Sequence, residues 1–289
     1  MRSKVSISIV VFSLLAAALG SACGDDGARG DGADADADSD ADSDTDSDSD
    51  ADDDCSEAAK VIYVVDSDNS FYRFDPPTKV FELVGTVDCG NMSSPFSMAV
   101  TRDAAAYVLF QDGAIFEVST ADASCTATPY LTGQSGFSVF GMGFATDGED
   151  TPEETLYVAN SASLATIDDD WALTVVGSIS GDPELTGNGL GELWGFFPTA
   201  TTPHVSRIDK GDAALVTTYP MSDLSNSASA WAFAYWGAAF YVFYESALDT
   251  STNVYRVDAE SGAVETYISA TGKRIVGAGV STCAPTTIE

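Results

Sequence analysis

The chain has 289 residues, with 45 acidic against 12 basic side chains and a formal net charge of -33 at pH 7. This charge argues against nucleic acid as a partner, because a polyanion would be repelled. A multi-pass membrane protein is excluded, because no long apolar run follows the N-terminal segment.

The N-terminal segment is typical of a secretory signal peptide, which we place at residues 1–22. Arg2 and Lys4 precede an apolar stretch over residues 5–19, and small residues follow it. This stretch of fifteen residues is too short to span a bilayer, which takes about 20. A charged start, a short apolar middle and a small-residue end predict export and cleavage.

The segment ends in Leu19-Gly20-Ser21-Ala22-Cys23. This run resembles the lipobox of bacterial lipoproteins, in which small residues precede a Cys that is lipidated and becomes the mature N-terminus. The resemblance implies a lipid anchor at Cys23. It also implies the outer membrane, facing the periplasm or the cell surface, because no Asp follows the Cys. The family usually has Leu where Gly20 stands, so ordinary signal cleavage is the alternative.

An acidic segment follows at residues 24–54, with 15 Asp and a single Arg. It has no aromatic and no branched aliphatic residue, so it cannot bury enough apolar surface to offset the entropy of ordering. Repulsion between closely spaced charges extends such a chain. The run resembles the Ser-Asp stalks of some bacterial surface proteins. We therefore expect residues 23–54 to be a lipidated Cys followed by a disordered tether.

A pair of strands recurs five times in the remainder of the chain. In each copy a short strand ends in Asp or Ser, and a second strand follows a turn. The five residues are Asp75, Ser119, Asp168, Asp209 and Asp258, at spacings of 44, 49, 41 and 49. Asp and Ser side chains bond the backbone amides of a turn, so we interpret these residues as turn residues.

Further strands complete each repeat. An aromatic or apolar strand precedes each pair, and a small-residue strand precedes that one in most copies. A similar small-residue segment at residues 275–282 has no unit after it, and the first unit has no small-residue strand before it. Repeats of about 40–50 residues with four short strands are typical of a β-propeller.

We therefore predict an all-β domain at residues 55–289, a single β-propeller of five four-stranded blades. The C-terminal strand is expected to close the first blade, which hides the sheet edges. The pattern resembles bacterial propellers with quinoprotein-like or WD-repeat-like blades, a resemblance that implies a fold and no specific function. A pair of β-sandwiches is the alternative, but it leaves the C-terminal strand unexplained.

Lipidation of Cys23 would leave four cysteines, an even set that is expected to pair in an exported protein. Cys55 lies just before the first strand of the propeller and Cys283 just after the last, so ring closure brings them together. Cys89 follows the first unit, and Cys125 begins the last strand of the second. We predict the disulfides Cys55–Cys283 and Cys89–Cys125.

Residues with the pattern of a reactive site are few. The single His, His204, has no Cys or second His near it, so we expect no metal site and no His-dependent catalysis. The Gly-rich run at residues 187–191 has no helix or Lys after it, so we expect a strand turn, no phosphate loop and no cofactor. The acidic clusters, including residues 153–154 and 168–170, fall where turns are expected.

Four aromatic residues fall on or beside inner strands: Trp194, Trp231, Tyr235 and Trp236. Most are expected in the core, and some could line a ligand cavity on the propeller axis.

Two classes of function remain. The first is a membrane-anchored propeller that serves as a binding or structural module for a protein or glycan partner. The second is an exported lyase or glycosidase that uses carboxylates at one face of the ring, which needs two converging carboxylates about 5–10 Å apart. The missing catalytic His pattern and the turn positions of the acids favour the first. We assign no catalytic residue.

Lipidation at Cys23 predicts a clear difference between two proteins expressed in a Gram-negative host. The wild-type chain should partition into detergent and incorporate labelled palmitate, because its Cys carries the anchor. A Cys23→Ser chain should be recovered unlabelled in the aqueous phase. Equal partitioning of the two proteins would show that the anchor is assigned wrongly.

Overall fold

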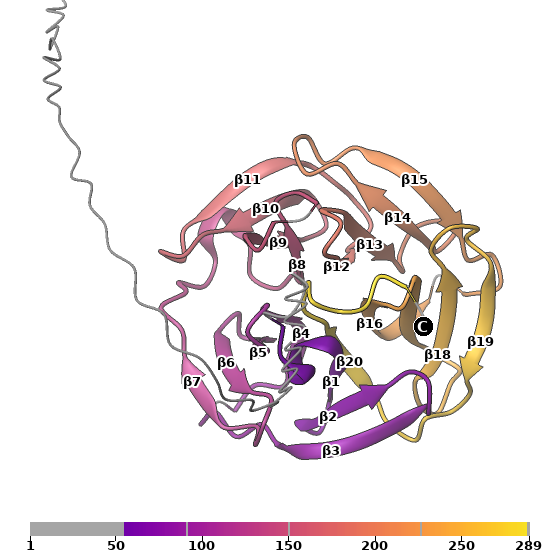
Figure 1. The fold of residues 1–289 in the computed structure, drawn as a ribbon, viewed down its shortest axis with the longest axis horizontal. Coiled ribbons are helices and arrows are strands. Elements are labelled where there is room, and N and C mark those ends of the chain that lie inside the picture. Colours follow the sequence, from indigo (N-terminus) through magenta and orange to yellow (C-terminus); the bar gives the residue numbers. More distant parts are fainter. Residues whose placement is uncertain (1–54, 91, 150, 226, 288–289) are drawn as a thin grey trace, which may run out of the picture. The chain divides into compact units, whose positions relative to one another are not determined.

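The computed structural model describes residues 55–90, 92–149, 151–225 and 227–287; the predicted signal peptide, Cys23 and the tether lie outside these residues. The described residues form five four-stranded antiparallel sheets that surround one axis as a five-bladed β-propeller (Figure 1). The predicted fold and blade number are confirmed. Two short 3-10 helices, η1 (Glu57–Lys60) and η2 (Gln134–Gly136), precede β1 and follow β7.

Each blade is built from four strands that follow one another from the axis outward. Blade 1 contains β20 (Ile275–Gly279), β1 (Ile62–Asp66), β2 (Ser70–Asp75) and β3 (Val80–Thr86). Blade 2 contains β4 (Pro95–Val100), β5 (Ala105–Phe110), β6 (Ile115–Ser119) and β7 (Cys125–Ala127). Blade 3 contains β8 (Gly141–Thr146), β9 (Glu154–Ala159), β10 (Ser163–Ile167) and β11 (Leu173–Ser178). Blade 4 contains β12 (Glu184–Gly187), β13 (Leu193–Phe197), β14 (His204–Ile208) and β15 (Leu215–Pro220). Blade 5 contains β16 (Ala228–Trp236), β17 (Ala239–Ser246), β18 (Asn253–Asp258) and β19 (Val264–Ile268).

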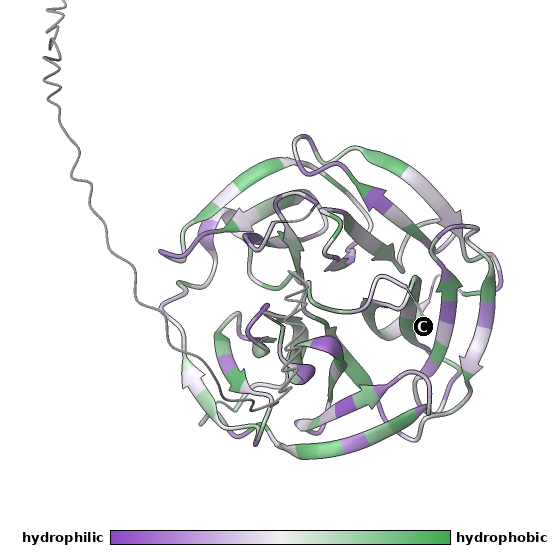
Figure 2. Ribbon diagram, in the orientation of Figure 1, coloured by the Kyte–Doolittle hydropathy of each residue, from purple (hydrophilic) through white to green (hydrophobic). Residues whose placement is uncertain are grey.

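Apolar side chains fill the seams between neighbouring blades, and apolar residues accordingly run along the strands (Figure 2). In β1, Ile62 and Val64 pack against blade 5, whereas Tyr63 and Val65 pack against blade 2. Successive side chains of a strand point to opposite faces, and here both faces meet a neighbour. Every residue of β1 is therefore buried, and the strand reads as an unbroken apolar run.

The ring closes between the last and first strands, as predicted. β20 pairs with β1, with Val64 opposite Ala278 and Val65 opposite Gly277. One inner strand was not predicted, namely β12 of blade 4. It has only four residues, and Glu184 and Thr186 interrupt any apolar pattern. The Gly-rich run that begins at its last residue forms the turn to β13.

The inner strands pack so closely around the axis that side chains are excluded from some positions. A Cβ added at Gly141 would lie 2.8 Å from Cα of Glu184, and one added at Gly143 would lie 2.8 Å from the carbonyl carbon of Leu185. Glycine at these positions lets β8 approach β12.

A buried carboxyl group joins three of these inner strands. Glu184 of β12 is 1% exposed, and its Oε1 accepts hydrogen bonds from the hydroxyl of Ser97 in β4 and from the N–H of Met142 in β8, the latter at 3.4 Å. Complete burial raises the pKa of the Glu184 carboxyl well above its ordinary value of 4.5, and the two hydrogen bonds only partly oppose this shift. The protonated form of Glu184 is thereby favoured at the centre of the ring.

Both predicted disulfides are present. Cys55 and Cys283, 228 residues apart in sequence, are bonded with a Cα–Cα distance of 5.9 Å. Cys89 and Cys125, 36 residues apart, are bonded with a Cα–Cα distance of 5.2 Å and link blade 1 to blade 2. The first bond joins the residues that flank the ring closure, so it reinforces the pairing of β20 with β1.

The raised pKa of Glu184 predicts a pH dependence that a single substitution removes. An acid whose pKa is higher in the folded state stabilises the fold fully below its unfolded pKa, and this contribution is lost as pH rises through the folded pKa. As pH rises above about 4.5, the free energy of unfolding of the wild-type protein should therefore fall relative to that of Glu184→Gln. Glu184→Ala should cost about 1–3 kcal/mol, because the buried hydroxyl of Ser97 loses its acceptor, whereas the N–H of Met142 keeps the Ser97 oxygen at 3.1 Å. Urea unfolding between pH 4 and 8 measures both effects, and parallel pH profiles for wild type and Glu184→Gln would contradict the assignment.

The two disulfides should differ in their contribution to stability. A cross-link restricts the unfolded chain more when it closes a longer loop, with typical effects of about 2–5 kcal/mol. Replacing Cys55 and Cys283 by Ser should therefore lower the free energy of unfolding by about 1.5 kcal/mol more than replacing Cys89 and Cys125. Chemical unfolding of the two double variants gives the comparison, and the reverse order would show that loop length is not the controlling factor.

Candidate functional site

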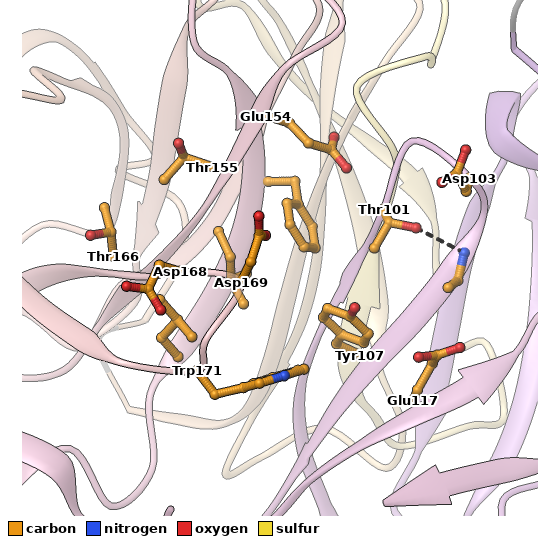
Figure 3. A pocket seen from close by; sticks show the side chains of 14 residues that line it. Thr101, Asp103, Tyr107, Glu117, Glu154, Thr155, Thr166, Asp168, Asp169 and Trp171 are labelled. Atoms are coloured by element: carbon orange, nitrogen blue, oxygen red, sulfur yellow. Dashed lines mark hydrogen bonds between the residues drawn. The ribbon is translucent and has the colours of Figure 1, made fainter. Parts of the chain in front are cut away.

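A cavity of about 730 Å³ lies at the seam between blades 2 and 3. One wall comes from the β4–β5 turn, β5 and β6, and the other from β8, β9, β10 and the turn after β10 (Figure 3). Aromatic and acidic side chains share its lining. The aromatic residues are Tyr107, Phe144 and Trp171, and the acidic residues are Asp103, Glu117, Glu154, Asp168 and Asp169. We call this cavity the seam pocket.

The backbone position that holds Trp171 recurs in every blade. The turn between the third and fourth strands contains one residue with φ between 60° and 71°, which we call the corner residue. The corner residues are Lys79, Ala123, Trp171, Ala213 and Gly262. A bulky side chain is rare at positive φ, where it is strained. Blade 3 is the one blade that carries an aromatic corner residue, and this residue lines the seam pocket.

Contacts with blade 2 and the loop after it hold Trp171 in place. Its ring lies with its centroid 5.2 Å from that of Tyr107 and 6.5 Å from that of Tyr130. The side chain of Gln134 donates to the carbonyl of Trp171 at 2.8 Å and accepts from the N–H of Leu173 at 3.1 Å. The indole and the Tyr107 phenol therefore form a fixed aromatic surface within the pocket.

Two of the pocket carboxylates also have structural partners. Asp168 accepts from the N–H groups of Asp170 and Ala172 at 3.0 and 2.8 Å, as predicted for a turn residue. Glu154 accepts from the N–H of Arg102 at 2.7 Å and from the hydroxyl of Thr282 at 2.9 Å. Burial raises the pKa of Glu154 above its ordinary value, and these two hydrogen bonds oppose the shift.

The carboxylates give the pocket a negative electrostatic potential. Burial raises the pKa of the Tyr107 hydroxyl, and the charges of Glu117, Glu154 and Asp169 raise it further. None of the 14 residues that line the pocket is Lys, Arg or His. Among the described residues, no group of three or more His, Cys, Asp or Glu side chains is arranged to hold a metal ion. The negative charge is therefore spread around the pocket walls.

The aromatic residues singled out from the sequence lie elsewhere. Trp194 and Tyr235 are buried in the core between blades 4 and 5, and Trp231 packs against the same cluster. Trp236 packs against the core between blades 5 and 1, and its Nε1 donates to the carbonyl of Lys60 at 2.7 Å. None of the four lines the seam pocket or a smaller cavity of about 220 Å³ between blades 4 and 5. All four pack in the seams between blades.

Sequence reasoning did not find the residues of the seam pocket. The sequence pattern places Glu154 and Asp168 in two separate turns. Asp168 does follow β10, but Glu154 is the first residue of β9, and both line the pocket with Tyr107 from the neighbouring blade. A local signal was available at Trp171. It follows its turn Asp by three residues, whereas the other corner residues follow theirs by four.

The fold defines this chain as a five-bladed β-propeller protein. No protein-family model and no curated protein matches its sequence. Among solved structures, a protein of unknown function from Bacteroides caccae aligns over 76% of this chain and 97% of its own, at 10% identity and a TM-score of 0.45. TolB from Acinetobacter baumannii aligns over 71% of this chain and 51% of its own, at 12% identity and a TM-score of 0.44. At these values neither likeness indicates a function.

The disulfides bear on where the protein resides. The two disulfides are typical of an exported protein, because they persist in oxidising compartments. In the part of the chain that the structure describes, no helix is long and apolar enough to cross a membrane.

Proposed function

We propose that this protein is an exported lipoprotein that binds a protein or glycan ligand in the seam pocket. The signal peptide, the lipobox-like Cys23 and the acidic tether support an outer-membrane anchor with the propeller held away from the lipid. The observation that carries the proposal is the pocket itself, which combines a fixed aromatic surface with several carboxylates at one blade seam. Cavities of several hundred cubic ångströms with convergent polar groups are typical ligand sites.

The aromatic surface favours specific binding. Trp171 and Tyr107 offer large apolar areas with few rotatable bonds, so little side-chain entropy is lost when a ligand covers them. Gln134, in the loop between blades 2 and 3, also fixes the turn that carries Trp171. A ligand would therefore meet a site that is already formed.

One observation favours the enzyme alternative, an exported lyase or glycosidase. Glu154 lies at the pocket with a raised pKa, as a general acid would. Both of its oxygens, however, accept hydrogen bonds, from the N–H of Arg102 and the hydroxyl of Thr282. These contacts orient Glu154 toward blade 2 and the C-terminal segment, so the geometry supports ligand binding better than proton transfer.

The corner residues supply a matched pair of variants for testing this proposal. Trp171→Gly removes the indole, and its backbone should be accepted because Gly262 occupies the equivalent position in blade 5. Ala213→Gly introduces glycine at the equivalent position of blade 4, away from the pocket. We expect full-length, detergent-solubilised wild type and Ala213→Gly to bind the same ligands on glycan and peptide arrays. Trp171→Gly should lose that binding by about tenfold or more and stay folded, with a melting temperature lowered by the loss of the ring contacts to Tyr107 and Tyr130.

Two outcomes would overturn the proposed binding site. One is an array ligand that binds Trp171→Gly as tightly as wild type. The other is the absence of any saturable ligand on either array.

A further inference from the structure

We infer that the seam pocket recognises an organic cation, specifically an ammonium group on an alkyl chain. This inference rests on the proposed binding function and specifies the chemistry of the ligand. It follows from a comparison of the pocket with the equivalent seam on the other side of blade 3, which the protein fills with a lysine of its own.

A lysine closes the seam between blades 3 and 4. Lys210 follows the turn residue Asp209 of blade 4 and reaches across to blade 3. Its Nζ donates to the carbonyl of Thr146 at 2.7 Å and to that of Asp147 at 3.2 Å. An ammonium group therefore occupies this seam, held by the residues where the inner strand of blade 3 ends.

The seam pocket has the same architecture without the lysine. Thr101 follows β4 as Asp147 follows β8, and the N–H groups of both donate across the turn, to the carbonyls of Ala105 and Glu153 respectively, at 2.9 Å in each case. Asp169 follows the turn residue of blade 3 as Lys210 follows that of blade 4. Thr101 and Asp169 both line the seam pocket (Figure 3). The pocket thus has an acid at the position from which blade 4 extends its lysine.

The negative charge of the seam pocket indicates what kind of ligand it would bind. Five carboxylates and no basic residue line the pocket. Residues 55–289 as a whole carry 30 acidic and nine basic residues, a field that draws cations toward the surface. The carboxylates are not arranged around a single metal site. An extended cation whose charge can meet several carboxylates fits this distribution better than a metal ion or a neutral glycan.

The aromatic surface favours an ammonium group in particular. Trp and Tyr faces attract cations through their quadrupoles, and the effect is larger when the cation is partly desolvated. The protein already uses this contact at another seam, where Nζ of the corner residue Lys79 lies 4.0 Å from the ring centroid of Tyr267. A lysine side chain of a protein partner and a free polyamine share the required chemistry, an ammonium on a chain that the Trp171 and Tyr107 rings can cover.

Calorimetric titration of the full-length, detergent-solubilised protein tests the inference with three probes. We expect 1,5-diaminopentane and Nα-acetyl-lysine amide to bind, and 1,5-pentanediol, which has the same chain length without charge, not to bind. Raising the salt concentration should weaken binding, because the contacts are electrostatic and partly exposed. The tighter of the two amines identifies the source, a lysine-bearing protein or a free polyamine.

Asp169→Lys is the decisive variant, because it copies the Lys210 arrangement into the seam pocket. It should weaken amine binding by about tenfold or more while the protein stays folded. Glu82→Lys makes the same charge change on the exposed face of β3 in blade 1 and should leave the affinity within about twofold of wild type.

Three results would overturn the cation inference: equal binding of the diol and the diamine, full affinity in Asp169→Lys, or no amine binding at up to about 10 mM. A neutral glycan that depends on Trp171 while the amines fail would overturn this inference alone and leave the proposed binding function standing. The absence of any Trp171-dependent ligand would overturn both.

Discussion

The pairing of β20 with β1 is the contact on which the other blades depend. Each blade buries both of its faces against neighbours, so every seam is complete only when the ring is closed. Without β20, the apolar strand β1 would become an open edge at the axis, and unpaired strand edges invite association with other chains. Closure packs the inner strands closely, so that Gly141 and Gly143 have no space for a side chain. The same packing buries the carboxyl group of Glu184 against Ser97.

The five seams share one plan and differ in what fills them. Lys79 and Lys210 lie in equivalent turns and reach across the seams to blade 5 and blade 3, respectively. The corner residues of blades 2 and 5 are small, namely Ala123 and Gly262. At the seam between blades 2 and 3, Trp171 and Asp169 replace the small and basic residues, and a pocket results. A repeated scaffold can acquire a site in this way, because a few turn residues change while the strands that position them do not.

The sequence alone carried enough information for the ring and the cross-links. Blade number, ring closure and both disulfides followed from a repeated strand pair and from the position of one unpaired segment. Strand β12 was not predicted, because its four residues alternate with polar side chains and show no apolar pattern. The seam pocket was not predicted for a different reason. Its walls come from two blades, and no sequence pattern shows that Tyr107 faces Trp171 until both blades are placed.

The disulfide between Cys55 and Cys283 has a mechanical consequence. Cys55 stands just before η1 and β1, so a pull on the chain ahead of β1 reaches this strand through Cys55. The covalent bond passes part of that tension directly to the segment that follows β20. The force is then shared by β1 and β20, and β1 cannot separate from the ring unless β20 moves with it. A load applied at Cys55 is in this way carried by the covalent bond, and the hydrogen bonds between β20 and β1 are spared.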